Sequence, residues 1–271
     1  MGDAMRSEKK SKKKRILFTV LGSFLGVILI LVLVIGIIAS KNVKAMNSTV
    51  DAFIAELQEN YTLTPRDVGE YQGLTVMGIM KFDVEQYEIE GIGNLSVMRM
   101  NIGVMQMATV VITPIDKNLP LFSTDYMYML TNRISYLEFY DLVANQDTAY
   151  QQLLADLTEV HNNYTYLPDA EVSEAWYSSL LTAHAYKNGK MSDDESLKNL
   201  MLDSLKVYEQ HANLLPLLSE EEKEEKRAIT IEYTDGLIEK SGISTDVFKK
   251  ELGMEKTKDF FDTVFFGTLA E

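Results

Sequence analysis

The chain has 271 residues, no cysteine and a formal net charge of −14. The absence of cysteine excludes disulfides, thiolate metal sites and cysteine nucleophiles. Residues 1–44 carry nine Lys/Arg and two Asp/Glu, which leaves 17 basic and 38 acidic residues, a net charge of −21, in the remainder. Such an acidic domain repels polyanions, so we expect no binding of nucleic acid.

A lysine-rich segment that ends at Arg15 is followed by an uncharged apolar run from Ile16 to about Ser40. At about 1.5 Å per residue, a helix of this length crosses a hydrocarbon core of about 30 Å. Seven Lys/Arg precede the run and two follow it closely, so the positive-inside rule places residues 1–15 in the cytoplasm and the chain after the helix outside. The alternative is a cleaved signal peptide, whose apolar core normally spans about 7 to 15 residues.

We therefore predict a single-pass protein of the cell membrane with a signal anchor over residues 16–40. Its very basic amino terminus and acidic, cysteine-free exterior are typical of a Gram-positive bacterium. Residues 41–69 are expected to form a juxtamembrane linker and one short helix, because apolar residues recur at helical spacing from Val50 to Leu57 and Pro65 follows.

The folded domain is expected to occupy residues 70–271, where the pattern changes to runs rich in Val, Ile, Met, Tyr and Thr that turn residues separate. We predict strands over 74–81, 84–90, 95–102, 105–113, 123–131 and 134–141. Their short connections indicate antiparallel neighbours and hence a meander.

Helical spacing returns after residue 144, and helices are predicted from Tyr150, from Ser192 and over the last segments, 245–252 and 257–266. The segment 176–186 is ambiguous and fits a further strand. Helices that follow a meander must cover its faces, so the fold class is α+β: an antiparallel sheet between helical layers.

Metal chemistry finds little support in the sequence. His161, His184 and His211 include no pair spaced three or four residues apart, so no helix face presents two imidazoles to a metal. Gly-rich phosphate loops and nucleophile elbows do not occur either. We expect no metal and no bound cofactor. His184 lies on the possible last strand, where it is interpreted as a partly buried histidine, with haem ligation as the alternative.

Two sets of side chains alternate along the predicted strands. Methionines alternate at positions 98, 100, 105 and 107, and tyrosines at 126, 128, 136 and 140, which we expect to form one aromatic face. Core packing is the default interpretation of both sets, and the lining of a site for a flat hydrophobic ligand is the other.

Three segments, in this order, resemble the ferredoxin-dependent bilin reductases over about residues 70–267. The first segment is similar to that family's strand, Leu-Pro-x-Phe-Gly-x-Asp turn and following strand. It consists of Val111-Ile112-Thr113-Pro114, then Asn118-Leu119-Pro120-Leu121-Phe122-Ser123-Thr124-Asp125, then Ile134-Ser135 to Tyr140-Asp141. The second segment is Trp176 with the run to Lys187, then Met191-Ser192-Asp193-Asp194-Glu195; the third is Val247–Gly253 with Phe260–Phe266.

The resemblance implies an open-chain tetrapyrrole held between the sheet and the carboxy-terminal helices, without metal or flavin. The family's proton-donating aspartate matches Asp125, which can act in this way if burial raises its pKa. Its glutamate and histidine partners fall near Asn101 and Thr109, which do not titrate but can hydrogen-bond a pyrrole. Ferredoxin docks on basic faces in the cytoplasm, so the acidic exterior argues against ferredoxin as a partner.

Three functional hypotheses remain open. The first is an extracytoplasmic domain, tethered to the membrane, that binds a planar hydrophobic molecule derived from haem. The second is a non-catalytic interaction module at the cell surface, and the third is a reductase with Asp125 as proton donor, so the sequence does not decide whether the protein is an enzyme. The candidate ligand-binding residues are Asn101, Thr109, Tyr126, Tyr136 and His184.

Overall fold

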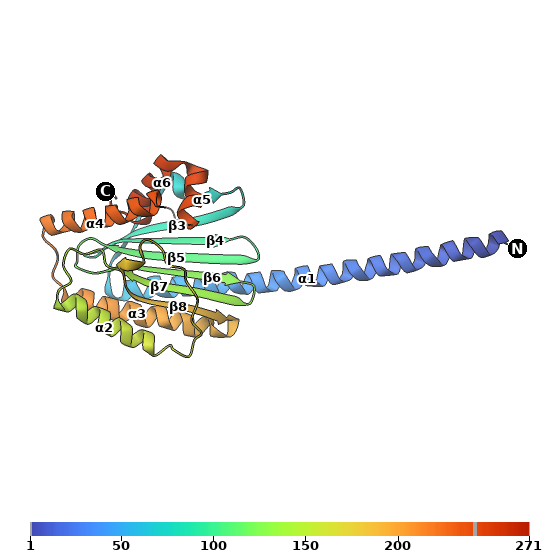
Figure 1. Ribbon diagram of the computed structural model, residues 1–271, viewed down its shortest axis with the longest axis horizontal. Helices are drawn as coiled ribbons and strands as arrows, with labels where there is room; N and C mark the ends of the chain where they lie inside the picture. Colours follow the sequence, from blue (N-terminus) through green and yellow to red (C-terminus); the bar gives the residue numbers. More distant parts are fainter. Residues whose placement is uncertain (1, 241–242, 271) are drawn as a thin grey trace.

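In the computed structural model, an antiparallel sheet lies between two helical layers, and a single long helix projects from one end of it (Figure 1). The backbone of residues 2–240 and 243–270 is described, as are the side chains of residues 24–240 and 245–270. The predicted α+β class and the antiparallel meander are confirmed. The basic side chains of residues 6–15 lie outside the described set.

Hydrogen bonds join the strands in the order β1-β3-β4-β5-β6-β7-β8, and β2 pairs with β3. The strands are β1 (Leu63–Arg66), β2 (Thr75–Val76), β3 (Met80–Ile89), β4 (Gly93–Asn101), β5 (Met105–Pro114), β6 (Leu121–Met129), β7 (Asn132–Tyr140) and β8 (Leu181–Lys190). The ambiguous segment 176–186 therefore contains a short 3-10 turn, η2 (Ser178–Leu180), and the start of β8.

Each face of the sheet buries its own hydrophobic core. Helices α1 (Gly2–Asn60), α2 (Thr148–Asn162) and α3 (Asp194–Leu214) cover one face, where the ring of Phe122 packs against those of Phe53, Phe139 and Tyr208. The other face carries α4 (Glu220–Glu239), α5 (Ile243–Leu252), α6 (Met254–Phe260) and the π-helical turn η4 (Phe261–Phe265), which supply a second, phenylalanine-rich core.

The structure corrects the expected linker at residues 41–69. Helix α1 runs without a break from Gly2 to Asn60, because no proline or glycine interrupts the chain after Gly36. Its side chains at positions 46, 50, 53 and 57 are at most 3% exposed and lie in the first core. The segment that follows α1 forms β1 at the edge of the sheet. This segment therefore belongs to the folded domain.

One buried arginine ties α1 to the sheet and to α3. The guanidinium of Arg133, which is 2% exposed, donates to the side chains of Asn42 on α1 and Asp194 on α3, and to the backbone carbonyl of Leu130. It also lies 4.8 Å from the ring centroid of Tyr128. A charge is buried here at a tolerable cost because hydrogen bonds from three elements satisfy it.

Replacing Arg133 should separate these elements. Arg133→Met keeps most of the volume but leaves Asn42 and Asp194 without their partner, so we expect a loss of about 3 kcal/mol in the free energy of unfolding. Urea unfolding of the full chain in detergent, followed by tryptophan fluorescence, measures it. Lys206→Met is the matched control: Lys206 is 49% exposed and pairs with Glu56 at 3.8 Å, so its loss should stay below about 0.5 kcal/mol. Equal losses would contradict the role of Arg133.

Candidate ligand-binding site

The register of the sheet brings polar and aromatic side chains together on the face that α4 to α6 cover only in part. Thr109 pairs with Asp125, Asp125 with Tyr136, and Tyr136 with Tyr186, so these four form one row across β5 to β8. The adjacent row on this face contains Glu138, paired with His184. We call these six residues the Asp125 strip.

Asp125 is a partly buried carboxyl group in the centre of this strip. Burial raises its pKa to about 6, and the negative charge of Glu138 acts in the same direction. The hydroxyl of Thr109 donates a hydrogen bond to Oδ1 of Asp125 and opposes part of this rise. The group therefore changes protonation state close to neutral pH.

Glu138 supplies a second carboxyl group on the same face. Its Oε2 accepts a hydrogen bond from the hydroxyl of Tyr140 at 2.8 Å, and its Oε1 accepts one from Tyr186 at 2.9 Å. Burial raises its pKa, although both hydrogen bonds favour the charged form. The Tyr186 ring stacks on His184, with centroids 4.7 Å apart, and meets Tyr136 edge-on at 5.3 Å.

Aromatic side chains close one side of the strip, and the other side is more open. Tyr140, Tyr177 and Tyr233 contact one another, and Trp176 packs on the last two. The other side of the strip is bordered by partly exposed apolar side chains on three strands: Met107, Met127 and Ile134. Tyr136 and Tyr186 are also partly exposed, and His184 is exposed. A flat ligand can reach this open part of the sheet without displacing the second core.

The structure brings four of the six sequence-predicted residues together: Asp125, Thr109, Tyr136 and His184. The expectation of one aromatic face is wrong, because Asp125 pairs with Tyr136 and therefore Tyr126 points to the opposite face. Tyr126 is 4% exposed in the first core, where its hydroxyl donates to the carbonyl of Leu197 at 2.9 Å.

Asn101 also lies away from the strip. It is the last residue of β4, where its Oδ1 accepts hydrogen bonds from the backbone N–H of Gly103 and from Nε2 of Gln106 at 3.0 Å each. These bonds close the turn between β4 and β5. The side chain thus acts in the hairpin, and its predicted contact with a ligand in the strip has no geometric support.

Sequence reasoning missed Glu138. Glu138 lies between Tyr136 and Tyr140 at alternate positions on a predicted strand, so the sequence already indicated that it shares a face with these two tyrosines. Its nearness to Asp125 depends on the β6–β7 register, which the two-residue turn between these strands sets.

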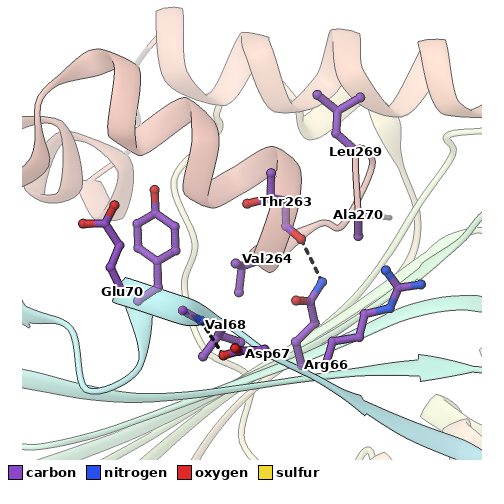
Figure 2. Close-up of a pocket in the computed structure, with 11 residues that line it drawn as sticks. Arg66, Asp67, Val68, Glu70, Thr263, Val264, Leu269 and Ala270 are labelled. Atoms are coloured by element: carbon purple, nitrogen blue, oxygen red, sulfur yellow. Dashed lines mark hydrogen bonds between the residues drawn. The ribbon is translucent and has the colours of Figure 1, made fainter.

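A separate hollow of about 620 Å³ lies at the β1 edge of the same face. Figure 2 shows Thr263, Val264 and Leu269 of the carboxy-terminal segment opposite the stretch from Arg66 to Glu70. Gln86 also lines it, and Gln86 and Glu138 occupy one cross-strand row, four strand spacings or about 19 Å apart. This hollow is therefore distinct from the Asp125 strip.

Within the part of the chain that the structure describes, no three His, Asp or Glu side chains are grouped so as to hold a metal ion. The chemistry that the strip can perform is proton exchange and hydrogen bonding by its carboxyl groups. Its tyrosines and neighbouring methionines offer apolar contact to a flat molecule.

No protein-family model matches the chain, and no curated protein matches its sequence. Among solved structures, it is similar to phytochromobilin synthase from tomato in complex with biliverdin. The TM-score is 0.64 and the identity 14%, over 81% of this chain and 83% of that chain. The expected bilin reductase fold is thus confirmed. At this identity the likeness concerns the fold.

The raised pKa of Asp125 predicts a pH-dependent stability. The folded chain binds the proton of Asp125 more tightly than the unfolded chain does. The stability that this proton contributes is therefore complete below about pH 4 and is lost as the pH rises through about 6. Asp125→Asn removes the titration and should gain stability relative to the parent chain between about pH 4 and pH 7, by at most about 3 kcal/mol.

Urea unfolding in detergent across this pH range measures the difference. Asp83→Asn, which changes an exposed carboxylate on β3, is the matched control and should show no such trend. A constant difference between Asp125→Asn and the parent chain would contradict the burial argument.

Proposed function

We propose that this protein is a membrane-tethered domain that binds a flat hydrophobic ligand of the open-chain tetrapyrrole class at the Asp125 strip. The observation that carries the proposal is the position of Asp125: a carboxyl group with a pKa of about 6, on a sheet face where partly exposed methionine and tyrosine side chains adjoin it. The biliverdin complex of the similar tomato enzyme supports the ligand class.

Each part of the strip suits a different part of such a ligand. Ionised Asp125 accepts hydrogen bonds from pyrrole N–H groups, and protonated Asp125 donates one to a carbonyl oxygen. The Tyr136 ring and the thioethers of Met107 and Met127 contact the flat faces of the conjugated system. His184 is exposed at the edge of the strip, where it is positioned to pair with a propionate group.

The tether is the amino-terminal part of α1. Its apolar part has a mean hydropathy of 2.7, and the domain buries none of it, which a helix that faces lipid requires. A signal sequence has the same properties. The excess of Lys/Arg before the apolar run supports a cytoplasmic amino terminus and an extracytoplasmic domain. That location and the acidic exterior argue against ferredoxin as the electron donor.

Two other functions fit particular features. Proton donation by Asp125 during ligand reduction is supported by its pKa and by the second carboxyl group on the same face, that of Glu138, whose pKa is also raised by burial. A non-catalytic interaction module is supported by the cluster of Tyr140, Tyr177 and Tyr233, which fills one side of the sheet face with side chains.

Absorbance titration tests the binding site. Because residues of α1 form part of the first core, the full chain in detergent is titrated with biliverdin and, separately, with haem. We expect a saturable spectral shift with biliverdin at micromolar concentration. Tyr136→Ala should weaken binding about tenfold through loss of ring contact, whereas Tyr166→Ala, at an aromatic position that is 65% exposed elsewhere, should not. A folded chain that shows no shift with either ligand would favour the interaction module.

Asp125→Asn separates binding from proton transfer. The amide still accepts the hydrogen bond from Thr109 but cannot deliver a proton, so affinity for biliverdin should change by less than about threefold. Turnover with a chemical reductant, followed by loss of biliverdin absorbance, should fall by at least about a hundredfold. Turnover equal to that of the parent chain would exclude Asp125 as the donor, and the binding site would be unaffected by that result.

A further inference from the structure

Large apolar side chains are exposed at three hairpin turns at the same end of the sheet. They are Met77 and Ile79 between β2 and β3, Val104 between β4 and β5, Met129 at the end of β6 and Leu130 in the β6–β7 turn, and their exposed fractions range from 39% to 72%. We call these five residues the hydrophobic rim. Figure 1 shows the β4–β5 and β6–β7 turns pointing the same way as the projecting part of α1.

Hydrogen bonds fix the rim to the helix at the level where the apolar segment ends. The side-chain amide of Asn42 donates to the carbonyl of Leu130 at 3.0 Å, and the N–H of Leu130 donates to the carbonyl of Val104 at 3.2 Å. Asn42 follows Ser40, the end of the apolar run, by two residues, or about 3 Å along the helix. A bilayer that α1 crosses therefore has its surface at the height of Leu130.

The backbone of the rim gives a second, independent indication. Met77 has φ of 54° and Leu130 has φ of 52°, the left-handed region that glycine and asparagine adopt more readily than other residues. They are the two described non-glycine residues with positive φ. Both are long apolar side chains at exposed turns, where glycine or a polar residue is the usual choice.

We infer that the hydrophobic rim rests in the interfacial region of the bilayer from which α1 emerges, so that the domain is docked on the membrane at a fixed orientation. The occupant of this surface is lipid, because the helix that leads to the rim is itself exposed and apolar over residues 24–37. Exposed Lys41 and Lys190, near the same end, suit the headgroup region. The inference rests on the proposed membrane tether and holds for either orientation of the helix.

In this arrangement, one end of the Asp125 strip lies nearer to the bilayer than the other. Met127 and Ile134 belong to the halves of β6 and β7 that end at the rim, and Glu138 and His184 lie towards the other end. A lipid-soluble ligand would thus reach the apolar end of the strip from the bilayer, with its polar groups directed away from the membrane.

Because the chain contains no cysteine, a single environment-sensitive NBD fluorophore can be attached at any introduced cysteine. The full chain is reconstituted into vesicles of phosphatidylcholine and phosphatidylglycerol, with and without lipid that carries a nitroxide high on its acyl chain. For Leu130→Cys and Val104→Cys, we expect blue-shifted emission that nitroxide lipid quenches by about half.

Leu217→Cys is the matched control. Leu217 is 62% exposed beside Gly91 in the β3–β4 turn, at the opposite end of the same strands and about 30 Å from the rim. It should not be quenched. Using both Leu130→Cys and Val104→Cys protects the test against a local effect of the modified turn.

Ile30→Cys, on the exposed part of α1, distinguishes failure of the inference from failure of the tether. Quenching at position 30 without quenching at 130 or 104 overturns the rim contact and leaves the tether intact. No quenching at any of these positions overturns the tether. Blue-shifted emission at 130 and 104 that nitroxide lipid does not quench assigns the rim to a protein partner and overturns the lipid assignment.

Discussion

The whole structure depends on the continuity of α1. The same helix exposes its large apolar side chains from Phe24 to Ile37 and then, from Met46 onwards, buries a stripe of side chains in the first core. A helix with no break transmits its direction, so the domain has no free pivot relative to the apolar segment. The buried guanidinium of Arg133 reinforces this at the point where α1 enters the domain, because it bonds to α1, the β6–β7 turn and α3 together.

The β6–β7 hairpin connects that constraint to the candidate site. Its two-residue turn sets the register that places Asp125 opposite Tyr136, and therefore directs Tyr126 and Tyr128 into the first core. The same turn carries Leu130, which bonds to Asn42 at the helix end of the domain. A single hairpin thus determines which side chains form the Asp125 strip and how that strip is placed relative to the apolar helix.

The sequence predicts those features that local patterns control. Alternating apolar residues located strands from β3 to β7 within a few positions, and Asp125 was found through the similarity of its turn to a known family. Features set by long-range pairing were not accessible. Only the packing of the first core shows that residues 41–60 continue α1 and do not form a linker. That Tyr126 and Tyr136 lie on opposite faces follows from the strand register, and a shift of one residue would reverse it. Glu138 was missed for the same reason, because its neighbours come from three strands.

Two buried charges elsewhere in the domain, those of Arg133 and Lys226, have an evident structural task, and Asp125 does not. Arg133 joins three elements, and Lys226 on α4 donates to the carbonyls of Leu119 and Leu142 at 2.7 and 3.1 Å, which holds two loops. Asp125 accepts its hydrogen bond from Thr109, its direct partner on a strand that the sheet ladder already secures. An acid with a raised pKa weakens folding near neutral pH, and an apolar residue at this position would remove that cost. Asp125 thus lowers the stability of the fold near neutral pH without joining its elements, and this favours the proposed role of its carboxyl group in ligand binding.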